Sequence, residues 1–140
     1  MNRNVLAAIA ATIAVLGVII LGFVVMGSPG SQRLVQADNR RVQRLAQLAQ
    51  QINNSWNHSD NVLPSNLEKF ADTFKNDPVT GTSFVYKPKA ESKYELCATF
   101  ARDNRDDPGI NTGDPWIHPG GEYCFFLDAT RPVPNVPYYY

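Results

Sequence analysis

The feature that most constrains this chain is an apolar segment close to its N-terminus. In the 22 residues from Val5 to Met26, Thr12 is the only one that is neither apolar nor glycine. A helix of this length covers about 33 Å, which is enough to cross a hydrocarbon core of about 30 Å. We therefore expect a transmembrane helix over residues 5–26, preceded by a short tail at residues 1–4.

A cleaved secretory signal is the alternative interpretation of this segment, with Arg3 as the basic residue ahead of the apolar region. The apolar stretch is longer than the roughly 7–15 residues of such a region, and no small-residue cleavage site of the A-x-A type follows it. These two features favour a retained anchor that contacts the lipid bilayer.

The charges around the segment and the cysteines predict opposite orientations. Four arginines, at positions 33, 40, 41 and 44, follow the apolar segment, whereas Arg3 and the amino terminus precede it. The positive-inside rule alone would place the domain in the cytoplasm. The two cysteines, Cys97 and Cys124, favour the outer side, because a disulfide between them persists only in an oxidising compartment.

The same cysteines could instead be buried free thiols in a cytosolic domain. No histidine or further cysteine stands at the spacing of a zinc site. A disulfide between them would close a loop of about 28 residues and contribute roughly 3–4 kcal/mol. We expect the disulfide, and with it a single-pass protein of a bacterial inner membrane with a cytoplasmic N-terminus and a periplasmic domain.

Composition excludes several classes of function. Thirteen basic and thirteen acidic residues give a net charge of zero, whereas nucleic-acid binding requires a concentrated positive surface. The 140 residues allow one span and one domain of about 100 residues. Motifs of the common hydrolases, nucleotide-binding proteins and c-type haem proteins are absent from the sequence, so we expect neither an enzyme nor a small-molecule substrate.

The rest of the chain predicts an α+β domain at residues 32–130, after a linker of breaker residues at 27–31. Apolar residues recur at helical spacing from about Gln32 to Trp56, which predicts a long amphipathic helix. Ser65 and Glu68 have the spacing of a capping box and predict a short helix through Phe70 and Phe74. Period-two alternation predicts strands at 83–87, 94–101 and 122–127.

These elements predict the fold class: the long helix packs on the aromatic face of a small antiparallel sheet of three to four strands. Both cysteines alternate with the aromatic residues of their strands, so they are expected to meet on the opposite face of the sheet.

A loop of about 20 residues, 102–121, separates the last two strands, and loops of this length are often functional. Its carboxylates are weak candidates for a calcium site, since calcium prefers oxygen ligands, although their spacing does not match an EF-hand. They are Asp103, Asp106, Asp107 and Asp114. An ordinary solvated loop is the alternative. His58 and His118 belong to no motif, and we expect solvated or capping roles for them. No other cofactor is expected.

The tail at residues 131–140 is rich in proline and ends in three tyrosines. Its spacing favours an extended, polyproline-like arm. We expect the tail, together with Trp116, to contact integral membrane protein subunits; a disordered end is the alternative. The tail residues concerned are Arg131, Pro132, Pro134, Pro137, Tyr138, Tyr139 and Tyr140.

The order of these elements resembles type IV pilins and type II secretion pseudopilins. The resemblance spans residues 40–101 and includes Leu63-Pro64-Ser65-Asn66-Leu67, Asp77-Pro78-Val79-Thr80-Gly81 and Tyr94-Glu95-Leu96-Cys97-Ala98. It implies an apolar anchor helix, an amphipathic helix and an antiparallel sheet. The glycine at the processing site of that family and its glutamate at the fifth mature position have no counterpart here, and no acidic residue precedes Asp38. We therefore expect a pilin-like fold that does not polymerise alone.

Two functions follow as expectations. The first is a non-catalytic accessory subunit of a larger membrane complex, of the respiratory or photosynthetic kind, that contacts its partners on the outer face. The alternative is a minor pilin- or pseudopilin-like component of a secretion or pilus machine.

Overall fold

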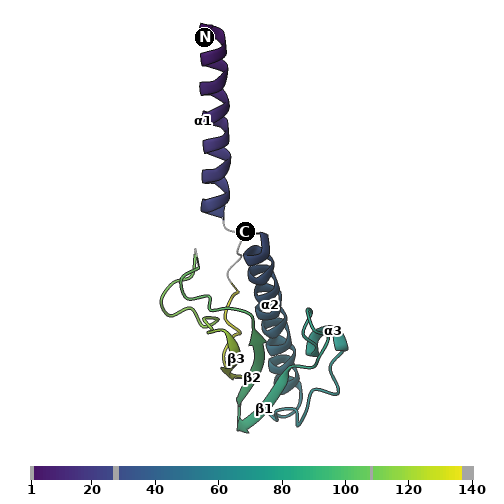
Figure 1. The fold of residues 1–140 in the computed structure, drawn as a ribbon. Coiled ribbons are helices and arrows are strands. Elements are labelled where there is room, and N and C mark those ends of the chain that lie inside the picture. The colour runs from purple at the N-terminus through teal and green to yellow at the C-terminus, as the bar shows by residue number, and fades with distance from the viewer. Residues whose placement is uncertain (1, 27–28, 108, 137–140) are drawn as a thin grey trace. The chain divides into compact units, whose positions relative to one another are not determined.

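The computed structural model describes residues 2–26, 29–107 and 109–136. Its elements, in chain order, are α1 (Arg3–Met26), α2 (Pro29–His58), α3 (Asp72–Lys75), β1 (Val85–Ala90), β2 (Lys93–Phe100) and β3 (Gly121–Asp128), as labelled in Figure 1. The chain divides into two compact units, Met1–Arg33 and Leu34–Tyr140, and each is described by itself.

The first unit consists mainly of α1, whose 24 residues correspond to a length of about 36 Å. Large apolar side chains are exposed along it, as at Ile13, Val18 and Leu21. The hydroxyl of Thr12 donates to the carbonyl of Ala8 at 2.9 Å, so this polar group has a partner within the helix. Among the described residues one helical stretch, at the N-terminus, is long and apolar enough to cross a membrane, as an anchor or a signal sequence.

The second unit begins within α2, which starts earlier than its hydrophobic pattern predicts. The helix begins at Pro29, inside the expected linker 27–31, because proline is favoured in the first turn, where its missing N–H is not needed. Beyond that turn, the predicted amphipathic pattern is confirmed. Four side chains on one stripe, Leu45, Leu48, Ala49 and Ile52, are fully buried.

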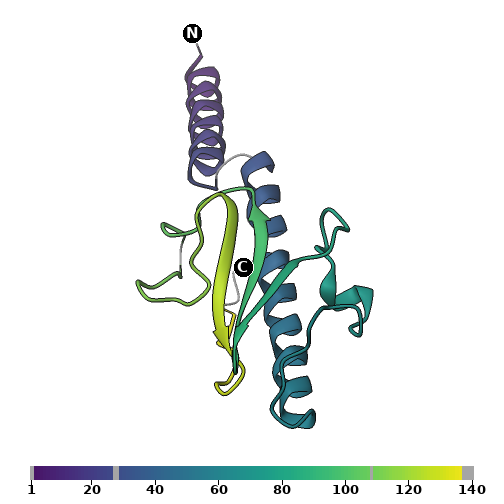
Figure 2. The ribbon, with the colours of Figure 1, turned by 90° about the horizontal axis from the view of Figure 1, so that it is seen from below.

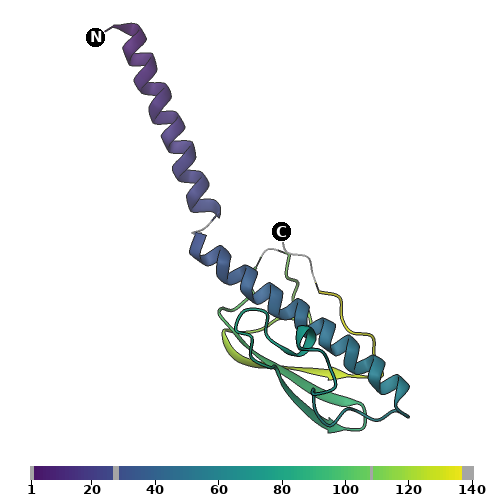
Figure 3. The same cartoon turned by 90° about the vertical axis from the view of Figure 1, so that its right-hand side faces the viewer.

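The sheet has three antiparallel strands in the order β1-β2-β3, so the α+β fold class is confirmed with three strands. Figures 2 and 3 show α2 lying along one face of this sheet. That face contributes Tyr94, Leu96 and Phe100 from β2 and Phe125 from β3 to the core shared with α2. Alternate residues of β2 and β3 therefore lie against the helix, and the others, including both cysteines, lie on the face away from it.

Two local predictions are wrong. The capping box at Ser65 does not form; instead the Asn66 carboxamide oxygen accepts from the backbone N–H of Glu68 at 3.0 Å. An Asn side chain bonded two residues ahead forms a turn that competes with helix formation, and the short helix α3 begins only at Asp72. The first strand begins two residues later than predicted and ends three residues later, and Ser83 forms an isolated bridge with Asn76 outside it.

Candidate functional site

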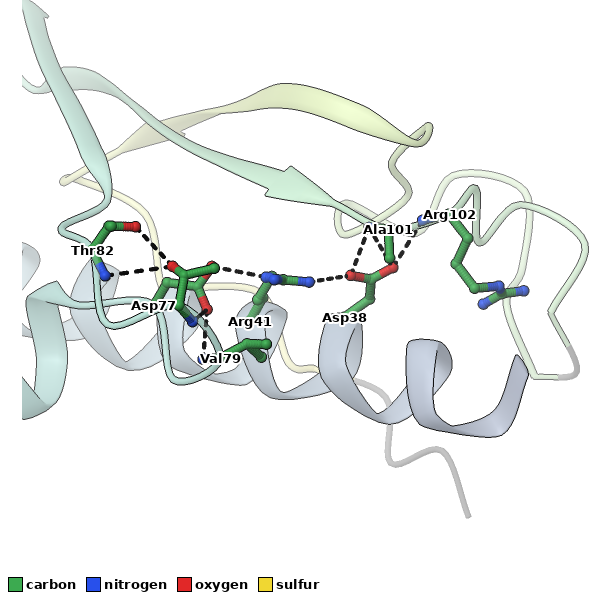
Figure 4. Close-up of polar contacts among 8 residues, drawn as sticks. Asp38, Arg41, Asp77, Val79, Thr82, Ala101 and Arg102 are labelled. Carbon is green, nitrogen blue, oxygen red and sulfur yellow. Dashed lines mark hydrogen bonds and ion pairs between the residues drawn. The ribbon is translucent and has the colours of Figure 1, made fainter. Parts of the chain in front are cut away.

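A buried ion network joins the first half of α2 to the turn before β1 (Figure 4). Arg41 lies between two carboxylates: its Nη1 is 2.8 Å from Asp38 Oδ1 and its Nε is 2.8 Å from Asp77 Oδ2. Each of the three side chains is less than 10% exposed, at 9% for Arg41, 2% for Asp38 and 8% for Asp77. Two carboxylates and one guanidinium leave an excess negative charge, which must be balanced by hydrogen-bond donors.

Backbone N–H groups at the end of β2 supply the donors for Asp38. The N–H of Ala101 donates to both Asp38 carboxylate oxygens, at 2.9 and 3.0 Å, and the N–H of Arg102 donates to Oδ2 at 3.1 Å. The carboxylate thereby binds the point at which the chain leaves the sheet (Figure 4). Asp38 thus connects α2 to β2 across more than 60 positions of the sequence.

The turn after Asp77 supplies the donors for the second carboxylate. Its Oδ1 accepts from the N–H groups of Val79 at 2.7 Å and Thr80 at 3.3 Å. The turn closes through the Gly81 N–H, which donates to the Asp77 carbonyl at 2.8 Å, and Gly81 has a φ of 76°, which glycine adopts without strain. Burial by itself raises the pKa of Asp77, but the bonds from Arg41 and the Val79 N–H outweigh it, so this pKa lies below its usual value.

The network is suited to holding three chain segments together, since a guanidinium is not a nucleophile and stays protonated. Burial by itself lowers the pKa of Arg41, but its bonds to Asp77 and Asp38 outweigh burial, so this pKa lies above its usual value. The sequence pattern predicts the turn at Asp77 but not its two partners, Asp38 and Arg41. The available signal was that Asp38 and Arg41 fall on the apolar stripe of α2, ahead of Val42 and Leu45.

The disulfide between Cys97 and Cys124 is confirmed. The two residues are directly opposite on β2 and β3, with Cα atoms 3.9 Å apart. Both sulfur atoms lie within 4.8 Å of a carboxylate oxygen of Glu95, which is itself paired with Lys89 at 3.0 Å. Because both sulfurs are in the disulfide, neither offers a thiolate to a metal.

The four aspartates proposed for calcium share no common partner. Arg105 pairs with Asp103 and lowers its pKa to about 2, and Arg102 pairs with Asp107. The carboxylate of Asp114 accepts from the Trp116 N–H at 2.8 Å, and Asp106 is exposed. In the described part of the chain these carboxylates do not converge on one point.

The two histidines lie in different environments. His118 is 1% exposed and stacks on Phe100 with ring centroids 3.7 Å apart, so a solvated role for it is wrong. Its Nδ1 lies 3.2 Å from the carbonyl of Pro119. Burial lowers the pKa of His118, against a smaller opposing effect of that carbonyl. His58 is exposed at the end of α2, and its Nδ1 lies 2.7 Å from the Asn54 carbonyl.

The described part of the tail packs on its own domain. Asn53 donates to the Arg131 carbonyl at 2.9 Å, and Trp116 Nε1 donates to the Pro134 carbonyl at 3.1 Å. Val133 and Val136 pack against the core. Trp116 is 1% exposed, so its ring has no free surface for a partner in this structure. Pro137, Tyr138, Tyr139 and Tyr140, which were expected to bind a partner, lie outside the described residues.

A groove of about 690 Å³ runs between α2 and this tail. It is lined by amide and apolar side chains, with no acidic or basic residue among them: Gln43, Ala46, Gln47, Gln50, Gln51, Phe74, Val133, Pro134, Asn135 and Val136. Acid–base or nucleophilic chemistry has no group to use among these lining residues.

No family model matches the chain, and neither the curated proteins nor the solved structures contain a match to it. The likeness to pilins is therefore one of layout: a long apolar helix, then an antiparallel three-stranded sheet that packs on a helix and contains a disulfide.

Proposed function

We propose that this protein is a membrane-anchored, non-catalytic component of a secretion or pilus machine, of the minor pilin or pseudopilin kind. The observation that carries the proposal is the layout of the chain. An apolar helix long enough to span a membrane is followed by a helix that forms one layer of a small disulfide-stapled α+β domain.

The two units have separate tasks in this proposal. The apolar side chains of α1 pack against the apolar helices of neighbouring subunits and against lipid, where close packing rather than the hydrophobic effect drives association. The domain is held rigid by the Asp38–Arg41–Asp77 network and the disulfide, and it presents its surface outside the membrane, where a disulfide persists.

The protein enters an assembly formed with other subunits rather than building a filament of its own. The first 37 residues contain no carboxylate side chain, so α1 cannot make the contact that the family's glutamate provides. This feature also supports a second candidate, an accessory subunit of a different membrane complex, for which a single anchoring helix suffices.

Co-isolation from gently solubilised membranes distinguishes the two candidates. An antibody raised against the domain is used to isolate the complex, and its subunits are identified and counted by mass spectrometry. We expect other subunits that each have one N-terminal apolar helix, at a fixed ratio to this protein. Recovery at a fixed ratio with a multi-span complex that contains redox cofactors would support the second candidate and overturn the first.

A matched control replaces residues 5–26 with a leucine–alanine helix of the same length. This variant still enters the membrane but loses the side-chain shape of α1. We expect it to be isolated without the partner subunits. Equal recovery of partners with the replaced helix would mean that α1 is only an anchor.

A further inference from the structure

The two edges of the sheet differ in how they are protected against pairing with another strand. At the β1 edge, Pro88 lacks a donor, a register shift follows it before Ala90, and Lys87 and Lys89 are charged. These devices block the addition of a strand. At the β3 edge, all eight residues of Gly121–Asp128 pair with β2 without a register shift, and none is a proline.

The disulfide shows which backbone groups of β3 face outward. In an antiparallel pair, opposite residues about 4.5 Å apart do not exchange hydrogen bonds, and their N–H and C=O groups point away from each other. Cys97 and Cys124 have Cα atoms 3.9 Å apart, so they are such a pair. The backbone groups of Cys124, and by alternation those of Glu122 and Phe126, therefore point away from β2.

These outward groups have no backbone partner among the described residues. A neighbouring bond agrees with this alternation of outward and inward backbone groups. The N–H of Ala129, the residue after β3, points inward and donates to the Ser92 carbonyl at 2.8 Å. The outward row continues to Asp128, whose carbonyl accepts from the Arg131 N–H at 3.0 Å and so ends the open edge. Glu122, Cys124 and Phe126 thus form a short template for main-chain pairing.

The side chains on this row also indicate a binding surface. Phe126 is 80% exposed, more than Val24 at 74%, the most exposed large apolar residue of α1 in the described part of the chain. It lies on the face of the sheet away from α2, in the same row as the disulfide. A carboxylate flanks this apolar centre at each end of β3, Glu122 on one side and Asp128 on the other.

We propose that the β3 edge binds an extended segment of a partner protein as a fourth strand of the sheet. The segment has apolar side chains next to Cys124 and Phe126 and a basic side chain opposite Glu122 or Asp128. Main-chain bonds to the outward groups provide affinity, and the apolar and charged side chains provide specificity. The inference goes beyond the proposed function and does not depend on which machine contains the protein.

A second copy of the chain is a poor occupant of this edge. Two long antiparallel registers of β3 with a second β3 bring the outward groups of both strands together. In one of them, Glu122 would lie opposite Asp128 of the other copy, and like charges there are destabilising. In the other register the exposed ring of Phe126 would face a Glu122 carboxylate. A partner strand with the opposite charges avoids both arrangements.

The test uses a fluorescent peptide, Lys-Thr-Val-Thr-Val-Thr-Lys, and the full-length protein in neutral detergent micelles. The peptide reads the same in both directions, so either orientation places lysines at the spacing of Glu122 and Asp128 and valines between them. We expect saturable binding by anisotropy, and slower hydrogen exchange of the Glu122, Cys124 and Phe126 amides. A peptide with N-methylvaline for both valines, which removes the N–H groups that face β3, or with glutamate for both lysines, should bind about tenfold or more weakly.

Two variants localise the binding. Phe126→Pro removes one outward N–H without touching the ladder to β2, and it should weaken binding roughly tenfold or more. Lys87 lies on the same face of the sheet, the one away from α2, but on β1. The control variant Lys87→Ser should therefore leave binding unchanged. If Phe126→Pro does not fold, weaker peptide binding by Phe126→Ser, together with slower exchange of the outward amides in the native protein, supports the proposal. Unprotected outward amides, or equal weakening by Lys87→Ser, would overturn the proposal.

Discussion

Arg41 Nε and Asp77 Oδ2 are 2.8 Å apart although 36 positions of the sequence separate the two residues. The bond fixes the turn before β1 to the first half of α2, and Asp38 fixes the end of β2 to the same helix. Because all three side chains are almost fully buried, removing one partner would leave a charge unpaired in the interior.

Replacing Arg41 with methionine should lower the free energy of unfolding by about 3 kcal/mol or more, because two buried carboxylates would lose their cation. Both tryptophans, Trp56 and Trp116, belong to the domain, so their fluorescence in a denaturant titration of the full chain reports its unfolding. The matched control is Arg40→Met on the exposed side of the same helix, expected to cost less than about 0.5 kcal/mol. Equal losses in the two variants would mean that the network adds no stability.

The stability of the domain should fall as the pH drops below about 6.5. Burial holds the pKa of His118 in the folded protein below 6.5, so the unfolded chain binds a proton first and acid shifts the equilibrium towards it. His118→Phe keeps a ring that can stack on Phe100. In this variant the free energy of unfolding should change less with pH between 6.5 and the lower pKa of the folded state. Denaturant titrations at several pH values measure this, with His58→Gln as the control. If the free energy of unfolding of His118→Phe falls with pH as steeply as that of the native protein, His118 is not the source of the pH dependence.

The sequence predicts the parts of the fold that depend on local periodicity. The apolar segment, the stripe from Val42 to Ile52 and the alternation around Cys97 and Cys124 all reappear as elements and buried faces. Local patterns fail where a neighbouring group competes, as at Asn66, whose side chain forms a turn that replaces the expected Ser65 cap.

Long-range polar contacts could not be predicted in the same way. Asp38 and Arg41 look like ordinary charges of a helix, and only the distant backbone of Ala101 and the Asp77 turn give them a reason to be buried. The position of His118 likewise depends on Phe100 and on Asn104, whose carboxamide oxygen accepts from the His118 N–H at 2.8 Å. Periodicity carries no information on such pairs.

Loss of the disulfide should lower the free energy of unfolding by about 3 kcal/mol, because the chain between the two cysteines, 27 positions long, becomes free in the unfolded state. The comparison is between the native protein and a variant with Cys97→Ala and Cys124→Ala, again followed by tryptophan fluorescence. Alkylation before and after reduction of protein extracted from membranes gives the state of the thiols. Alkylation of the unreduced native protein would contradict both the bond and the outer location of the domain.

Two truncations separate the contribution of the tail to folding from any contribution to association. Removing residues 132–140 deletes the carbonyl of Pro134 that accepts from Trp116 and the packing of Val133 and Val136. We expect this to cost about 1–3 kcal/mol of stability. Removing residues 137–140 leaves those contacts in place and should not reduce stability. If the shorter truncation weakens co-isolation of partner subunits, the three tyrosines bind them; if it does not, the partner-binding role expected for them is wrong.

The most direct test of the proposed function is photo-crosslinking from α1 in living cells. A photoreactive amino acid replaces Ile13, whose side chain is 64% exposed. After irradiation, the crosslinked partners are identified by mass spectrometry. A pilin-like component should crosslink to other subunits through their single N-terminal apolar helices. Crosslinks confined to lipid, or to the helices of a multi-span complex, would contradict the proposal that α1 assembles with pilin-like subunits.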